Sequence, residues 1–240
     1  YELSNYKNFR NNKINFIMDI GSSPPKKFSN DYQAGALSFE FISNGKKILT
    51  NAGYHNAKNT KLNKISKSSA VHNVLTIDDN SSCEFKKNSK SEFEIKEGLK
   101  TIKKELEYTD NYWKIVAEHD GYLKKYNLIY TRKIEFYPKK NKLIGTDKIT
   151  IKKSLPNLKF DIRFHLNPNA KVMKTQDNQS ILVDIEGEGW KFKCNKFKID
   201  IDNGLYFGKK NTYSENQNIF ISGNTQKEDQ LIEWEISKIK

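Results

Sequence analysis

The chain has 240 residues, which suits one large β domain or two small ones, and its 12% of aromatic residues excludes a disordered polar chain. No uninterrupted hydrophobic run approaches the ~20 residues of a membrane-spanning helix, so we expect no membrane span. The net charge of +13, from 42 Lys and Arg against 29 Asp and Glu, favours an anionic partner: nucleic acid, anionic lipid or acidic polysaccharide.

Alternation of hydrophobic and polar residues predicts β-strands along most of the chain, without a convincing helix. Segments 36–43 and 46–50 are expected to form a hairpin through the tight turn Asn44-Gly45. Turn signals recur about every ten residues, which is typical of an all-β chain folded as a large antiparallel β-sandwich. The further strands are expected at 71–77, 113–119, 128–136, 158–166, 181–185, 190–194, 197–201, 219–221 and 232–236.

The segment Glu94 to Glu107 has the Lys and Glu content of a helix, but the alternation around it favours a long, exposed hairpin. No linker or internal repeat divides the chain, so we predict one domain over residues 1–240. The chain begins at Tyr1 without a signal-like stretch, and we expect a piece of a longer protein. Cys83 and Cys194 either form one disulfide or stay free, and their spacing does not predict a cysteine metal site.

Arginine is scarce, because only three of the 42 cations are Arg. Proteins that read phosphates or bases favour the planar fork of arginine, so a nucleic-acid partner ranks low. The lysines are spread along the chain beside many Asn and Ile, and both compositional drift and selected affinity for polyanions explain that excess. The three arginines are Arg10, Arg132 and Arg163.

Two of the four histidines fall on predicted strands. His165 alternates with Arg163 and Asp161, and the three side chains form either an acidic-sugar groove or, slightly favoured, a solvated face with a cross-strand ion pair. His119 falls on a hydrophobic face, where a hydrogen-bonded core histidine is the more frequent outcome.

The other two histidines fall near predicted loops. His72 follows a run of small residues and precedes a strand, which places its imidazole toward a pocket. His55 is expected to be an exposed loop residue. No nucleophile elbow, metalloprotease motif, P-loop or dinucleotide fingerprint is present.

An ordered set of segments resembles the C-terminal β-sandwich of heparinase II/III-like polysaccharide lyases, from about residue 20 to the end. The strongest is AGALSFEF at 34–41, which with ILTNAG at 48–53 and the stretch around AVHN at 70–73 matches three successive family motifs. HDGY at 119–122, RKI at 132–134, RFHLNP at 163–168 and GWKF at 189–192 follow in the family's order.

The resemblance implies a sandwich that follows an upstream (α/α) toroid, which this chain lacks. Family members cleave uronic-acid polysaccharides by β-elimination, with Tyr and His transferring protons, and the sandwich supplies one wall of the cleft and a structural zinc site. The family's three zinc ligands correspond here to Gln33, Asn51 and His72, and the first His of its HxH motif corresponds to Asp31. Neutral amides do not suit zinc, so we predict no tightly held zinc, with Gln33 and Asn51 hydrogen-bonding His72 instead.

We therefore expect the C-terminal domain of a lyase for an anionic uronic-acid-containing polymer, glycosaminoglycan-like or alginate-like, in the periplasm, cell envelope or outside the cell. Alone, this domain should lack turnover. The alternative is a non-catalytic glycan-binding or structural sandwich of the cell envelope. The expected catalytic residues are His72, His119 and Tyr54, and the expected substrate-binding residues are Arg132, Arg163, His165, Lys67 and Asn73. No cofactor is expected.

Overall fold

The computed structural model describes residues 2–239, apart from 4, 58–59, 154–156 and 209–211. Antiparallel strands dominate it, which confirms the predicted sandwich. The largest sheet has eight strands in the order β14-β15-β16-β19-β12-β11-β10-β9. They are β9 (Thr101–Thr109), β10 (Tyr112–His119), β11 (Leu128–Tyr137), β12 (Lys142–Ile151), β14 (Lys171–Lys174), β15 (Ser180–Ile185), β16 (Glu188–Cys194) and β19 (Gln230–Lys238).

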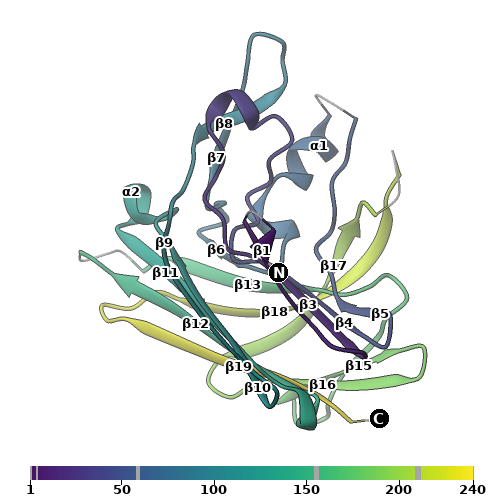
Figure 1. Ribbon diagram of the computed structural model, residues 1–240. Helices are drawn as coiled ribbons and strands as arrows, with labels where there is room; N and C mark the ends of the chain where they lie inside the picture. Colours follow the sequence, from purple (N-terminus) through teal and green to yellow (C-terminus); the bar gives the residue numbers. More distant parts are fainter. Residues whose placement is uncertain (1, 4, 58–59, 154–156, 209–211, 240) are drawn as a thin grey trace.

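Two smaller sheets pack against this sheet (Figure 1). One has the order β17-β18-β13-β6, and the other runs from β1 to β5 in sequence. The first contains β6 (Leu75–Ile77), β13 (Lys159–His165), β17 (Lys198–Tyr206) and β18 (Ser214–Asn224). The second contains β1 (Glu2–Leu3), β2 (Tyr6–Arg10), β3 (Ile14–Asp19), β4 (Phe39–Ser43) and β5 (Lys46–Leu49).

Aromatic rings from all three sheets meet in the core. The Trp234 indole of β19 stacks on Phe39 of β4 at 5.8 Å between ring centroids and meets Phe164 of β13 edge-on at 4.6 Å. Gly145 of β12 permits this contact, because a Cβ there would lie 2.0 Å from the Trp234 ring. Such tilted and stacked pairs contribute beyond the area that they bury.

A layer of loops and short elements covers one side of the two smaller sheets. In Figure 1, β7, β8 and α1 project upward from the sheets, and β7 and β8 form a separate two-stranded sheet. We call the described residues of the segments 20–38, 51–57, 60–74 and 78–100 the loop layer. It contains η1 (Lys26–Phe28), α1 (Lys61–Ser66), η2 (Ser69–Val71), β7 (Glu84–Lys87) and β8 (Phe93–Glu97), whereas α2 (Leu123–Tyr126) and η3 (Pro138–Lys140) connect strands of the large sheet.

Several local expectations need correction. Segment 94–107 is extended as predicted, but its two strands do not pair with each other, because β8 pairs with β7 and β9 with β10. Segment 71–77 is a strand only at Leu75–Ile77. Helix α1 was not expected, and the sandwich also contains strands β2, β3, β12 and β14 that the alternation did not reveal. Both cysteines are free and buried.

No helix within the described ranges is long and hydrophobic enough to cross a membrane.

Candidate functional site

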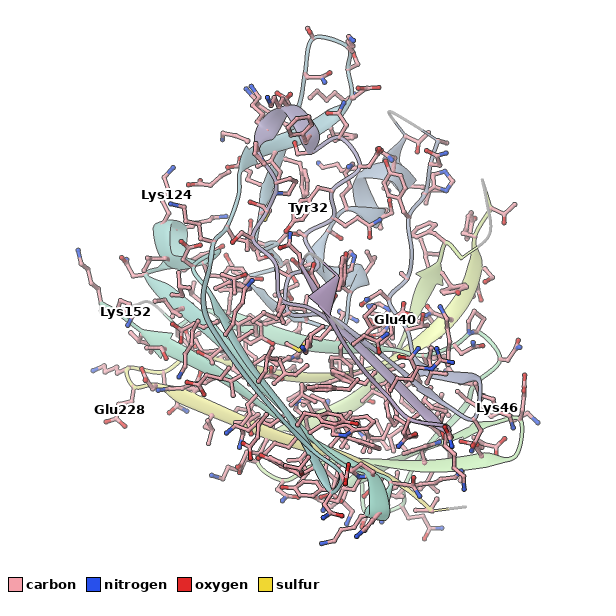
Figure 2. All side chains as sticks on the ribbon, viewed as in Figure 1. Tyr32, Glu40, Lys46, Lys124, Lys152 and Glu228 are labelled. Carbon is pink, nitrogen blue, oxygen red and sulfur yellow. The ribbon has the colours of Figure 1, made fainter. Side chains whose placement is uncertain are left out.

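A cavity of about 460 Å³ lies between the loop layer and the five-stranded sheet, and we call it the loop pocket. Figure 2 labels two residues that line it, Tyr32 from the loop layer and Glu40 from β4. The pocket also brings together Gln33, Asn51 and His72, which are far apart in the sequence. It is therefore the place where the predicted zinc positions converge.

His72 is 3% exposed, and both of its ring nitrogens have partners. Nδ1 donates to the Ser68 carbonyl at 2.8 Å, because that oxygen can only accept. Nε2 lies 2.9 Å from Gln33 Oε1. Since Nε2 of this tautomer accepts, the Gln33 amide is assigned with its oxygen and nitrogen exchanged, so that its nitrogen donates to the ring. Burial lowers the pKa of His72 to about 4, so the ring is neutral at pH 7. Gly35 allows this approach, since a Cβ there would lie 2.6 Å from the ring.

The donor set in the loop pocket does not fit zinc. Gln33 binds His72 as predicted, but Asn51 does not: its Oδ1 accepts from the Asn73 backbone N–H at 2.9 Å, which corrects that expectation. Zinc prefers imidazole, thiolate and carboxylate ligands over neutral amides. In the described part of the chain, no three His, Cys, Asp or Glu residues are grouped so that they could hold a metal.

Asn73 is a buried residue that joins several segments. Its Nδ2 donates to the Phe39 carbonyl at 2.8 Å, and its Oδ1 accepts from the backbone N–H of His165. Its own N–H donates to Asn51, and its carbonyl accepts from Arg132. Because every polar group of Asn73 is used inside the protein, its geometry favours a structural role over the predicted binding of substrate.

Arg132 is also enclosed, with 0% exposed surface. Its Nε and Nη2 donate to the two carboxylate oxygens of Asp147 at 2.6 and 3.0 Å, and Nη1 reaches the carbonyls of Leu37 and Asn73. Asp147 accepts further hydrogen bonds from Tyr130 and Trp234, so each charged nitrogen and oxygen of the buried pair has at least one partner. The guanidinium is therefore used inside the protein, and its burial argues against the predicted substrate-binding role.

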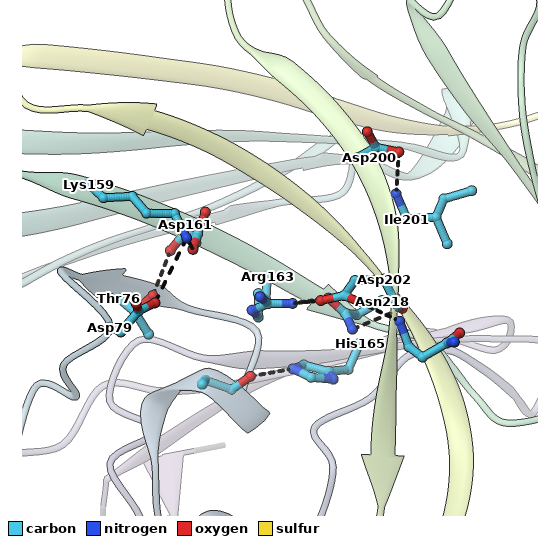
Figure 3. A network of polar contacts seen from close by, with 12 residues as sticks. Thr76, Asp79, Lys159, Asp161, Arg163, His165, Asp200, Ile201, Asp202 and Asn218 are labelled. Atoms are coloured by element: carbon cyan, nitrogen blue, oxygen red, sulfur yellow. Dashed lines mark hydrogen bonds and ion pairs between the residues drawn. The ribbon is translucent and has the colours of Figure 1, made fainter.

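The polar row of β13 is only partly solvated. Asp161 and His165 are buried, which corrects the predicted solvated face, and the expected cross-strand ion pair is present between Arg163 and Asp202 at 3.1 Å (Figure 3). His165 Nε2 donates to the Ala70 carbonyl at 2.9 Å, and burial lowers the pKa of His165 to about 3. Only Arg163, with 21% of its side chain exposed, remains available to a substrate among these residues.

His119 lies in the core against the rings of Tyr122 and Tyr130. Its Nδ1 accepts from the Gly121 N–H at 3.1 Å, and burial lowers its pKa to about 3. His119 is thus a core residue, with Nδ1 bonded and Nε2 without a partner among the described residues. This burial argues against the predicted proton transfer from His119 to a substrate. His55 is buried against Phe207 instead of exposed, which also corrects the sequence-based expectation.

Tyr54 is the predicted catalytic residue that keeps partial exposure, and it lies beside the loop pocket. Its hydroxyl donates to Asp31 Oδ1 at 3.2 Å and accepts from Asn63 Nδ2 at 3.1 Å. Asn63 comes from α1, whose N-cap Thr60 accepts from the Asn63 N–H at 3.0 Å. Alternation analysis missed Asn63 because this six-residue helix depends on Leu62 and Ile65 packing against the rest of the loop layer.

Lys67 supports the same cluster from inside. It is 1% exposed, its Nζ donates to the carbonyls of Asn30 and Tyr32, and the ammonium lies 5.3 Å from the centre of the Tyr54 ring. Burial lowers the pKa of Lys67 to about 8. Its charge thus holds the loop that carries Asp31, and this burial argues against the predicted contact of Lys67 with substrate carboxylates.

Carboxylates dominate the charge of the loop pocket. Asp19, Asp31 and Glu40 line it, and no Lys or Arg does so among the described residues. Burial raises the pKa of Asp19 to about 6, whereas Glu40 accepts hydrogen bonds from the Thr50 hydroxyl and the Asn51 N–H, each at 3.1 Å. The sequence analysis missed Asp19 and Glu40, although Glu40 occupies a polar position in an alternating strand.

Comparisons with known proteins agree with this architecture. The family model of the heparinase II/III-like C-terminal domain matches residues 1–235. A heparan sulfate lyase from Pedobacter heparinus superimposes with a TM-score of 0.79 at 13% identity, covering 99% of this chain and 35% of that one. A heparinase III structure superimposes with a TM-score of 0.71 at 16% identity, covering 95% of this chain and 32% of that one.

A 4-alpha-glucanotransferase from Thermococcus litoralis also superimposes, with a TM-score of 0.51 at 9% identity, over 97% of this chain and 37% of that one. No curated protein matches the sequence. This chain spans about a third of the length of the two lyase structures. Since the family model covers almost the whole chain, the chain belongs to the heparinase II/III-like family and corresponds to its C-terminal domain.

Proposed function

We propose that this domain forms one wall of the cleft of a polysaccharide lyase that cleaves an anionic, uronic-acid-containing polysaccharide by β-elimination. Membership of the heparinase II/III-like family supports a lyase. Two similar structures, a heparan sulfate lyase and a heparinase III, support the same assignment. The net charge of +13 supports a polyanionic substrate. The remaining wall would come from an upstream toroid of the same protein.

The observation that carries this proposal is the hydrogen-bonded Tyr54 hydroxyl beside the loop pocket. β-Elimination removes the C5 proton of a uronate and protonates the 4-oxygen of the leaving sugar, so it needs a group that carries protons. Tyr54 donates to Asp31 and accepts from Asn63, which orients its hydroxyl. The nearby Lys67 ammonium stabilises negative charge that develops on the phenol.

The other predicted catalytic residue of the pocket, His72, acts here as a positioning residue. Both of its nitrogens are engaged, and its contact with Gln33 fixes the loop that carries Asp31. The three pocket carboxylates repel a uronate carboxylate. The substrate's acid group therefore lies outside the pocket, toward the exposed Lys61 and Lys64 that flank Asn63 on α1.

The test is a screen of the natural full-length protein against heparan sulfate, alginate and other uronate polymers, with the unsaturated uronide product detected by its ultraviolet absorbance. Activity on at least one polymer is expected, and Tyr54→Phe should reduce it by about 10²–10⁴-fold, the usual contribution of a proton-transferring side chain. Tyr213→Phe, a change at an exposed tyrosine outside the pocket, serves as the control. Full activity of Tyr54→Phe would exclude this role.

A second candidate function is that of a non-catalytic glycan-binding domain. It is favoured by the burial of His72, His119 and His165, because the three histidines predicted to be catalytic or substrate-binding are then shielded from solvent. This function predicts polymer binding without any unsaturated product. Both functions need access to extracellular polysaccharide, so we propose a periplasmic, cell-envelope or secreted location.

A further inference from the structure

A second cavity, of about 520 Å³, lies at the edge of the sandwich, and we call it the edge pocket. The β14–β15 loop supplies Asn178 and Gln179, and the β16–β17 turn supplies Asn195 and Lys196. The edge pocket and the loop pocket share no lining residue. Since the proton-transfer cluster lies at the loop pocket, the edge pocket needs a separate explanation.

The edge pocket is basic. Lys174, Lys196 and Lys198 line it, and Asp200 is its one carboxylate among the described lining residues. The Nζ atoms of Lys174 and Lys198 lie 3.5 and 3.4 Å from the two oxygens of Asp200, which are long distances for charge-assisted hydrogen bonds. Lys196 forms no ion pair with any described residue. The pocket therefore has one position at which two ammonium groups converge and a third cation close by.

The surroundings of Asp200 favour exchange with an external anion. Figure 3 shows Asp200 on β17, away from the Arg163–Asp202 pair, with a hydrogen bond only from the Ile201 N–H among the residues drawn. Both Asp200 ion pairs are partly solvated, because the side chains of Lys198 and Asp200 are 75% and 36% exposed. Exposed ion pairs of this kind contribute little to stability, so a sulfate or carboxylate can take the place of Asp200 at low cost.

The uncharged residues of the pocket suit a sugar ring. Asn178, Gln179 and Asn195 offer amide donors and acceptors for hydroxyl groups. Phe197 is held edge-on against Phe160 at 5.6 Å and presents a partly buried ring to the pocket. Lys174 is held more firmly than the other lysines, since only 23% of its side chain is exposed and it bridges two sheets through Asp200.

We propose that the edge pocket is a second glycan-binding subsite that takes a sulfate or carboxylate group of an acidic polysaccharide, remote from the bond that is cleaved. The binding of an anion is inferred from the lysines alone, whereas the identification of that anion as part of a polysaccharide rests on the proposed function. In this arrangement Asp200 is an internal competitor that occupies the anion position when no glycan is bound.

Calorimetric titration of the purified protein with a sulfated heparan sulfate oligosaccharide and with inorganic sulfate tests the site. The triple variant Lys174→Gln/Lys196→Gln/Lys198→Gln should weaken oligosaccharide binding by about tenfold or more. The matched control is Lys103→Gln/Lys133→Gln/Lys148→Gln, which removes the same charge from lysines in exposed ion pairs of the large sheet. It should weaken binding by less than about threefold, because it alters only the general attraction.

The variant Asp200→Asn tests the proposal in the opposite direction, because it should strengthen binding instead of weakening it. Removing the competing carboxylate frees Lys174 and Lys198, so affinity should rise by roughly threefold, about 0.7 kcal/mol. Equal losses in the two triple variants, or weaker binding by Asp200→Asn, would overturn the site. Binding is measured by the heat of titration and cleavage separately by ultraviolet absorbance. A protein that binds through the edge pocket but cleaves no polymer would therefore uphold the subsite while rejecting the lyase function.

Discussion

The loop pocket and the edge pocket differ in charge and in what supports them. The loop pocket is lined by three carboxylates and stands on buried side chains whose polar groups are bonded inside the protein. The edge pocket is lined by three lysines from strand ends and turns, and two of them, Lys174 and Lys198, form long ion pairs with Asp200. The net positive charge of the chain is therefore not concentrated where the chemistry is proposed. We infer that the lysines attract and hold the polymer, while the loop pocket orients a few reacting groups.

Breaking the buried pair beneath the loop pocket should have the largest effect on stability. Arg132→Met leaves the Asp147 carboxylate buried and unpaired, so the free energy of unfolding should fall by about 3–5 kcal/mol in urea denaturation. Arg132→Met/Asp147→Asn should recover part of that loss. At the edge pocket, Lys198→Met should change stability by no more than about 0.5 kcal/mol. Similar small losses for Arg132→Met and Lys198→Met would show that the two pockets are supported alike.

Removing the amide of Asn73 should have the next largest effect. Asn73→Ala leaves the Phe39 carbonyl and the His165 N–H without these partners in a buried region, which should cost about 2–4 kcal/mol at about 1–2 kcal/mol for each group. Asn169→Ala, at an exposed turn, is the control and should be nearly neutral. A cost below about 1 kcal/mol for Asn73→Ala would mean that water or a neighbouring side chain replaces the lost hydrogen bonds.

The buried histidines should make the protein less stable in acid. Burial lowers the pKa values of His72, His119 and His165 to about 4, 3 and 3, against an ordinary 6.5. The unfolded chain therefore binds more protons below pH 6.5, and stability falls from there until the folded-state pKa is reached. Each histidine contributes a slope of about 1.4 kcal/mol per pH unit. Asp19, whose pKa is raised to about 6, acts in the opposite sense.

His72→Gln isolates one of these contributions, because it removes the titrating ring and keeps a polar side chain. Denaturation measured at several pH values between 6.5 and 4 should show a slope lower by about 1.4 kcal/mol per pH unit than that of the wild type. An unchanged slope would indicate that His72 is protonated in the folded protein.

Metal removal should have the smallest effect. The Gln33, Asn51 and His72 set does not suit zinc, so the purified protein should contain no stoichiometric zinc, and a chelator should leave its melting temperature unchanged. Gln33→His/Asn51→Asp would supply two better ligands beside His72 and should gain zinc-dependent stabilisation. Stoichiometric zinc in the wild type that disappears in His72→Ala would contradict the amide arrangement.

Local patterns were sufficient for the regular hairpins and the long strands. Asn44 and Gly45 both have positive φ, 47° and 78°, as the predicted tight turn requires. The strand predicted at 128–136 is β11, Leu128–Tyr137. Strand β12 was not predicted because Gly145 and Asp147 interrupt its hydrophobic face. Both residues are explained by contacts with other strands, since Gly145 leaves room for the Trp234 ring and Asp147 pairs with Arg132.

The candidate site was predictable as a set of positions but not as a set of roles. Alternation placed Asp161, Arg163 and His165 on one polar face, yet it could not reveal that the Ala70 carbonyl covers His165. The order of the motifs assigned His72 and Asn73 to the site. Only the fold shows that the side chains of both residues are hydrogen-bonded to carbonyl groups inside the protein. Burial depends on what packs over a residue from elsewhere in the chain, and that information is absent from local spacing.

The most direct test compares both pockets in one steady-state assay of the full-length protein on its preferred uronate polymer. We predict that Tyr54→Phe lowers kcat by at least about 100-fold with little change in KM. The Lys174→Gln/Lys196→Gln/Lys198→Gln variant should raise KM by about tenfold while keeping kcat, since it removes binding that is equal in the ground and transition states. A wild-type kcat in Tyr54→Phe, or a loss of kcat confined to the lysine variant, would contradict the assignment of chemistry to the loop pocket.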